Sequence, residues 1–171
     1  MWKNKIALAA GLFVLAVVMV IVFGIPKPEA KAPATVEKIE SPRSSGALAA
    51  RESKFDFGSI SMAAGKVTHN YWIRNTGATP IVITKLYTSC MCTTAALVKA
   101  GRKFDPYGMP GHGYIPALNE PLAPNEDAMI EIVFDPAAHG PAGVGPIERV
   151  VTIENNAAPP LELALSAVVT P

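Results

Sequence analysis

The chain carries the stretch LELALSAVV at residues 161–169, in which every second residue is apolar: Leu161, Leu163, Leu165, Ala167 and Val169. An apolar period of two places these side chains on one face of an extended strand. The stretch therefore predicts a β-strand with one face in a hydrophobic core.

The same period recurs along the chain, and no helical period separates the runs. Five further runs show it, at residues 55–57, 67–74, 81–87, 128–134 and 147–153. The 13 glycines and 16 prolines suit short strands joined by turns. Residues 53–171 are therefore predicted to form an all-β, immunoglobulin-like β-sandwich of about seven strands, once a poorly marked strand is counted.

The composition points to a second segment. Half of the 171 residues are hydrophobic, only 17% are charged, and the mean hydropathy is +0.28. The excess lies at residues 6–25, which are uncharged and, apart from Gly11 and Gly24, hydrophobic. Twenty residues span about 30 Å as a helix, whereas the apolar core of a cleaved signal peptide has only about 7–15. Residues 1–25 are therefore predicted to form a transmembrane anchor.

Charges near this segment predict its orientation. Lys3 and Lys5 precede it, which favours a cytoplasmic amino terminus and an extracytoplasmic domain on an inner or cytoplasmic membrane. Residues 26–52 are rich in proline and alanine and are predicted to be a flexible linker. The net charge is only +1, without a cluster of basic residues, so the sequence argues against a nucleic-acid partner.

Cys90 and Cys92 are the only cysteines. In an extended strand they would lie about 6.5–7 Å apart, too far for the Cβ spacing of a disulfide, so the chain must turn for them to join. Three interpretations stay open: a disulfide, two buried thiols, or a pair of metal ligands.

The metal interpretation draws on Met109 and His112. They lie in a long connection, residues 93–125, which is rich in glycine and proline and is expected to be mostly irregular. Two thiolates with a thioether and an imidazole suit copper(I) and, less well, zinc. The alternative is that Met109 packs and His112 is an exposed loop residue. No catalytic motif occurs in the sequence, so we do not expect an enzyme.

The order of short motifs resembles a known family. Those motifs include Phe55-Asp56-Phe57-Gly58, Asn75-Thr76-Gly77, Ser89-Cys90-Met91-Cys92-Thr93 and Phe134-Asp135-Pro136. They are similar to a bacterial family of exported domains of unknown function, related to the ASPM–SPD-2–hydin and major-sperm-protein-like immunoglobulin folds, over residues 53–169. That family usually has Ser-Cys-Gly-Cys-Thr, so Met91 departs from it. The resemblance implies a fold and an export route.

Two functions follow as hypotheses. The first is a membrane-anchored, non-catalytic domain that binds a protein in or near the membrane, as a scaffold, assembly factor or accessory subunit of an envelope complex. The second is copper(I) binding or delivery through Cys90, Cys92, Met109 and His112. In its architecture the chain is also similar to copper-delivery proteins that assemble cytochrome oxidase.

Overall fold

The computed structural model describes residues 48–157 and 159–171, which all belong to one unit of the chain, Ser41–Pro171. The predicted anchor, residues 6–25, lies outside this part. Among the described residues no helix has the length and apolarity needed to cross a membrane. The sandwich begins earlier than the predicted boundary at residue 53, because β1 (Leu48–Ala50) pairs with β3 (Val67–Asn75). Three residues are too few to show a period.

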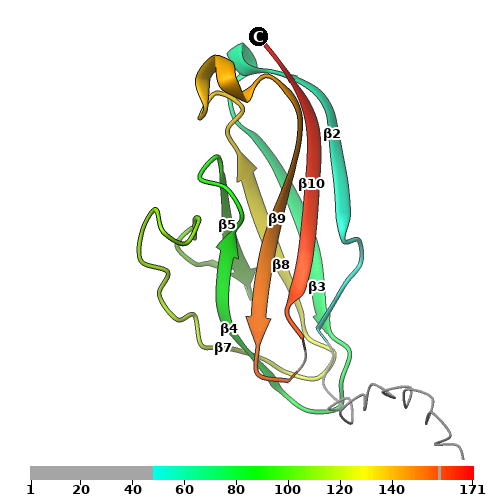
Figure 1. Ribbon diagram of the computed structural model, residues 1–171. Coiled ribbons are helices and arrows are strands. Elements are labelled where there is room, and N and C mark those ends of the chain that lie inside the picture. Colours follow the sequence, from blue (N-terminus) through cyan, green and yellow to red (C-terminus); the bar gives the residue numbers. More distant parts are fainter. Residues whose placement is uncertain (1–47, 158) are drawn as a thin grey trace, which may run out of the picture. The chain divides into compact units, whose positions relative to one another are not determined.

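Two five-stranded sheets make up the described structure (Figure 1), which confirms the all-β prediction. We call the first the β3–β8 sheet; its order is β1, β3, β8 (Asp127–Phe134), β5 (Thr93–Lys99) and β6 (Arg102–Lys103). We call the second the β9–β10 sheet; its order is β2 (Lys54–Ser61), β10 (Leu161–Thr170), β9 (Gly145–Asn155), β4 (Ile81–Thr88) and β7 (Glu120–Leu122).

All strand pairs are antiparallel except β2 with β10, which are parallel and lie side by side in cyan and red in Figure 1. Two short 3-10 helices, η1 (Met62–Ala64) and η2 (Gly140–Gly143), follow β2 and β8.

The core forms where the apolar faces of the two sheets meet. On β3, Tyr71 and Ile73 are fully buried, whereas Trp72 between them is 43% exposed. On β10, Leu163 and Leu165 are fully buried. The period of two therefore selects one face of each sheet for the core, as the sequence predicts.

β5 was not predicted as a strand, and neither were the short strands β1, β6 and β7. β5 occupies Thr93–Lys99, at the start of the connection that the sequence predicts to be mostly irregular. Thr93, Ala95 and Leu97 face the core, and Ala96 on the outer face is buried as well. A strand with buried residues on both faces lacks a clear apolar-polar alternation, which explains why the period does not reveal it.

Two connections between the sheets run next to each other. The chain passes from β4 to β5 through residues 89–92, and from β8 to β9 through residues 135–144. Thr93 pairs with Phe134, and the Asp135 amide donates to the Cys92 carbonyl over 2.8 Å. This pairing brings the loop that follows β8 to the cysteines.

Candidate functional site

The cysteines lie in a tight turn. The Thr93 amide donates to the Cys90 carbonyl over 3.1 Å, which closes a four-residue turn from Cys90 to Thr93. The buried Thr88 hydroxyl lies 3.0 Å from the Cys90 carbonyl oxygen and 2.9 Å from that of Thr93. The turn is thus held from inside by a side chain of the preceding strand.

Ser89 ties the same turn to β9. Its amide donates to the Val150 carbonyl over 2.9 Å, and its hydroxyl accepts from the Val150 amide over 2.9 Å. The cysteines therefore stand on a backbone that is fixed to both sheets.

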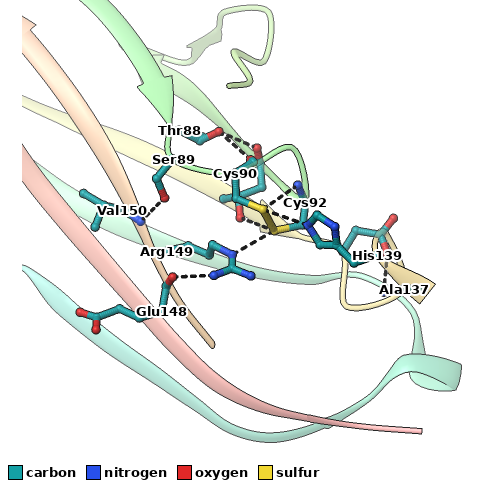
Figure 2. Close-up of a disulfide and its surroundings, with 11 residues drawn as sticks. Thr88, Ser89, Cys90, Cys92, Ala137, His139, Glu148, Arg149 and Val150 are labelled. Carbon is teal, nitrogen blue, oxygen red and sulfur yellow. Dashed lines mark hydrogen bonds between the residues drawn. A yellow bond between two sulfur atoms is a disulfide. The ribbon is translucent and has the colours of Figure 1, made fainter. Parts of the chain in front are cut away.

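Cys90 and Cys92 form a disulfide (Figure 2). Their Cα atoms lie 5.3 Å apart, within the usual range for a disulfide and shorter than the spacing in an extended strand. Both residues are buried, whereas Met91 between them is 49% exposed at the tip of the turn.

His139 reaches the disulfide from the loop that follows β8. Its Nε2 lies 3.1 Å from Cys90 Sγ, and the imidazole is otherwise exposed to solvent. One potential metal-ligating atom from each of Cys90, Cys92 and His139 lies within 4.8 Å of the other two.

Arg149 approaches the second sulfur from β9. Its Nε–H donates to Cys92 Sγ over 3.2 Å, and Nη1 donates to the Glu148 carbonyl over 2.8 Å. Figure 2 shows the imidazole and the guanidinium coming to the disulfide from separate segments of the chain. Within residues 48–157 and 159–171, no carboxylate forms an ion pair with Arg149.

A pocket of about 390 Å³ opens beside these groups. His139 and Arg149, which contact the two sulfurs, both line it, together with Val144, Ile147 and Glu148. Val144 is 44% exposed, so the pocket wall offers an apolar surface beside the two polar groups. The site therefore combines two sulfurs, an imidazole, a guanidinium and an adjoining pocket.

The other two predicted ligands, Met109 and His112, lie in the connection between β6 and β7. Met109 and His112 form a turn of their own, in which the His112 amide donates to the Met109 carbonyl over 3.2 Å. Met109 is half-buried and His112 is exposed. His112 is not in the group with the cysteines; the imidazole brought to the sulfurs is that of His139. The next residues, Gly113 to Ile115, line a different pocket with Lys85 and Tyr87 of β4.

Sequence reasoning missed His139 and Arg149 as members of the site. His139 follows the Phe134-Asp135-Pro136 motif in a loop of ordinary length, which carries no signal of function. Arg149 did carry a signal. It occupies the position between Ile147 and Val151 in the alternating apolar series of β9, where an aliphatic residue is expected.

Comparison with known families gives one match. Residues 48–105 match the family described as Protein of unknown function (DUF1573). The matched segment runs from β1 to just beyond β6 and includes the Cys90–Cys92 turn. The match supports the resemblance to a domain family of unknown function. That this family usually carries Ser-Cys-Gly-Cys-Thr, where the chain has Ser-Cys-Met-Cys-Thr, stays a prediction. None of the curated proteins matches the chain.

Comparison with solved structures gives distant matches, and one with a TM-score above 0.5 supports the fold. A protein of unknown function from Porphyromonas gingivalis W83 has a TM-score of 0.54 and 18% identity over 74% of this chain and 48% of its own. The chain thus spans about half the length of that protein. PapD-like domain 7 of human CEP192 has a TM-score of 0.47 and 14% identity, over 85% of this chain and 98% of that domain. The secreted serine protease VesC from Vibrio cholerae has a TM-score of 0.46 and 16% identity, over 71% of this chain and 23% of that protein.

Proposed function

We propose that the chain is a single-pass membrane protein whose extracytoplasmic sandwich binds another protein in or near the membrane. In this proposal it is a non-catalytic scaffold, assembly factor or accessory subunit of an envelope complex. Residues 6–25, twenty uncharged and mostly hydrophobic residues, support the anchor. The observation that carries the binding role is an apolar row on the outer face of the β3–β8 sheet.

This row consists of Trp72, Met129 and Val98. Trp72 pairs with Met129 across β3 and β8, and Met129 pairs with Val98 across β8 and β5. Paired residues of antiparallel strands share a face, and the neighbours of Trp72 and Met129 in sequence are buried in the core. The row therefore lies on the outer face, where Trp72 is 43% exposed.

Charged residues surround the row. The Arg51 guanidinium lies 5.1 Å from the ring centre of Trp72, in cation–π contact. Arg74 pairs with Asp127 next to it along the strands, and Lys103 pairs with Glu131. An apolar centre with tryptophan and a charged rim is typical of a protein–protein interface, in which tryptophan and arginine often contribute most of the affinity.

Site-specific photo-crosslinking of the full chain in its own membrane tests this proposal. A photoreactive amino acid at position 72 is expected to give a discrete crosslinked species, and Met129→Glu is expected to abolish it. Val168 provides the matched control because it is an apolar residue with 49% exposure on the β9–β10 sheet.

Equal crosslinking from positions 72 and 168, or none from position 72, would contradict a binding role for this face. Deleting residues 6–25 should release the chain from the membrane fraction. A chain that stays in that fraction after the deletion would contradict the anchor.

A second candidate function is copper(I) binding, favoured by the group of Cys90, Cys92 and His139. After reduction, two thiolates and an imidazole supply three ligands of the kind that copper(I) prefers. A monovalent ion with two thiolates carries one net negative charge, which the guanidinium of Arg149 would balance. The ligand set that the structure supports thus has His139 in the place predicted for His112.

Anaerobic copper(I) titration of the reduced full chain tests this candidate. Affinity should be lost in the Cys90→Ser, Cys92→Ser double variant and weakened by about 10- to 100-fold in His139→Ala. His112→Ala is the matched control and should bind like the wild type. Binding that survives the double variant would overturn the copper function, and an effect of His112→Ala equal to that of His139→Ala would overturn this ligand set.

A further inference from the structure

We propose that the Cys90–Cys92 disulfide is a redox-active pair that exchanges with a cysteine thiol of a partner protein. In this exchange His139 receives the proton of the incoming thiol, and Arg149 holds the Cys92 thiolate that leaves. The inference rests on the surroundings of the two sulfurs and is independent of the Trp72 row and of copper binding.

The two sulfurs contact different polar side chains. Cys90 Sγ has the imidazole Nε2 at 3.1 Å, and Cys92 Sγ has the guanidinium Nε at 3.2 Å. A disulfide is neutral and gains little from a neighbouring cation, whereas a thiolate is strongly stabilised by one. Disulfides are opened faster when the leaving sulfur is stable as a thiolate.

Arg149 is placed beside Cys92 without a competing carboxylate. It lies in the inward-facing series of β9 between Ile147 and the fully buried Val151, and in the described part of the chain no carboxylate pairs with it. Arg149 is half-buried and lines the pocket, and a negative charge on the acceptor of its Nε–H would strengthen that hydrogen bond. A Cys92 thiolate, formed when the disulfide opens, would supply that charge at the observed distance.

Cys90 is the less covered of the two buried cysteines. Its residue is 9% exposed and that of Cys92 3%, so we expect an incoming thiol to attack at Cys90. The pocket lined by His139 and Arg149 adjoins the site, and the exposed apolar side chains of Met91 and Val144 lie on the turn and on the pocket wall. Apolar contacts around the disulfide suit a cysteine within a polypeptide better than a small hydrophilic thiol.

The partner thiol loses its proton to His139 Nε2, and its sulfur bonds to Cys90 Sγ while the Cys90–Cys92 bond breaks. The electron pair of that bond stays on Cys92 Sγ, which becomes a thiolate beside Arg149. A second partner thiol then attacks the partner sulfur of the mixed disulfide and releases Cys90 as a thiol. In sum, two partner thiols are oxidised to a disulfide, and the Cys90–Cys92 pair is reduced to a Cys90 thiol and a Cys92 thiolate, which becomes a thiol when it takes the proton held on His139.

The test measures reduction of the oxidised full chain in detergent micelles with a metal chelator present. Two probes are compared at equal thiol concentration: glutathione, and a synthetic peptide with one cysteine between two leucines. Acid quenching, alkylation of the freed sulfur and mass spectrometry locate the adduct. We expect the probe on Cys90, the alkyl group on Cys92, and faster exchange with the peptide than with glutathione.

Variants test the two polar groups. Arg149→Gln and His139→Gln should each slow peptide exchange by about tenfold, because each removes a charge-assisted contact that forms during the step. Arg102→Gln is the matched control, since Arg102 is an exposed arginine on β6, and it should exchange like the wild type. Met91→Ser should reduce the advantage of the peptide over glutathione.

Three results would overturn the proposal. The first is an adduct on Cys92 of the wild-type chain, a measurement that does not depend on the folding of any variant. The second is exchange by both Arg149→Gln and His139→Gln at the rate of Arg102→Gln. The third, equal rates with peptide and glutathione, would overturn the assignment of a protein thiol as the partner.

Discussion

Asn75 is a buried polar residue that holds together the end of β3. Its side-chain amide donates to the carbonyls of Thr79 over 2.8 Å and Leu122 over 3.0 Å, and its Oδ1 accepts from the Gly77 amide over 2.9 Å. Substitution by alanine would leave two carbonyls and an amide without their partner. We expect Asn75→Ala to lower the free energy of unfolding by about 2–4 kcal/mol.

Urea unfolding followed by circular dichroism measures this change. Asn70→Ala is the matched control, because Asn70 lies on the same strand with its side chain exposed, and it should change stability by less than about 0.5 kcal/mol. Equal effects of the two substitutions would show that the buried hydrogen bonds of Asn75 contribute nothing beyond those of a surface residue.

At the scale of the elements, an ion pair joins the end of β3 to the start of β8. Arg74 Nε donates to Asp127 Oδ1 over 2.8 Å, and Arg51, just beyond β1, lies 3.7 Å from the same carboxylate. The hydrogen bond from Arg74 is the main reason that the pKa of the Asp127 carboxyl lies below its usual value. The Asp127 carboxyl of the unfolded chain therefore binds a proton at a higher pH than that of the folded chain. The contribution of Asp127 to stability is present at neutral pH and is lost as the pH falls through the acid range below about 4.

We therefore expect Asp127→Asn to lower the melting temperature slightly at neutral pH, since exposed ion pairs stabilise little. The difference from the wild type should shrink as the pH is lowered toward the pKa of the folded state. Thermal unfolding across the acid range measures it, with the exposed Glu162→Gln on β10 as the control. A difference that stays constant with pH would contradict this account.

Long strands that alternate between the core and solvent were predictable, whereas the shortest strands and β5 were not. Runs such as residues 128–134 and 161–169 alternate because one face meets the core and the other meets solvent. β5 has buried residues on both faces, and β1, β6 and β7 have only two or three residues each, so none of them shows a period. The missed strands have a common physical feature. None of them has enough solvent-facing residues in alternation with buried ones to produce a period in the sequence.

The candidate site was predictable only in part for a related reason. Cys90 and Cys92 are visible because their spacing is local, whereas His139 joins them through the pairing of Thr93 with Phe134 across two strands. Long-range pairing of this kind leaves no mark on spacing along the chain. Arg149 is different, because a charge in the apolar series of β9 breaks a local pattern. Such a break points to an inward-facing charge with a specific partner.

At the scale of the whole molecule, a tyrosine hydroxyl links the two sheets through the core. The Tyr71 hydroxyl on β3 donates to the Ala164 carbonyl on β10 over 2.6 Å, and the Tyr71 residue is fully buried. Burial, and to a smaller extent the charge of Glu52, raises the pKa of Tyr71 to about 12. In the unfolded chain the same phenol titrates near 10. Unfolding therefore releases a proton between these two values, and stability falls as the pH rises through them.

This linkage gives a prediction for Tyr71→Phe, which keeps the ring and removes the hydroxyl. At neutral pH the variant should be less stable by about 1 kcal/mol, because the Ala164 carbonyl loses its donor. From about pH 10 to pH 12 the free energy of unfolding of the wild type should fall by on the order of 1–2 kcal/mol more than that of the variant. The difference in stability between the two proteins should therefore close or reverse. Urea unfolding at a series of alkaline pH values measures the gap, and Tyr114→Phe, at a residue with 88% exposure, is the control. A gap that stays constant up to pH 12 would mean that the phenol joining the sheets ionises as easily in the folded chain as in the unfolded one.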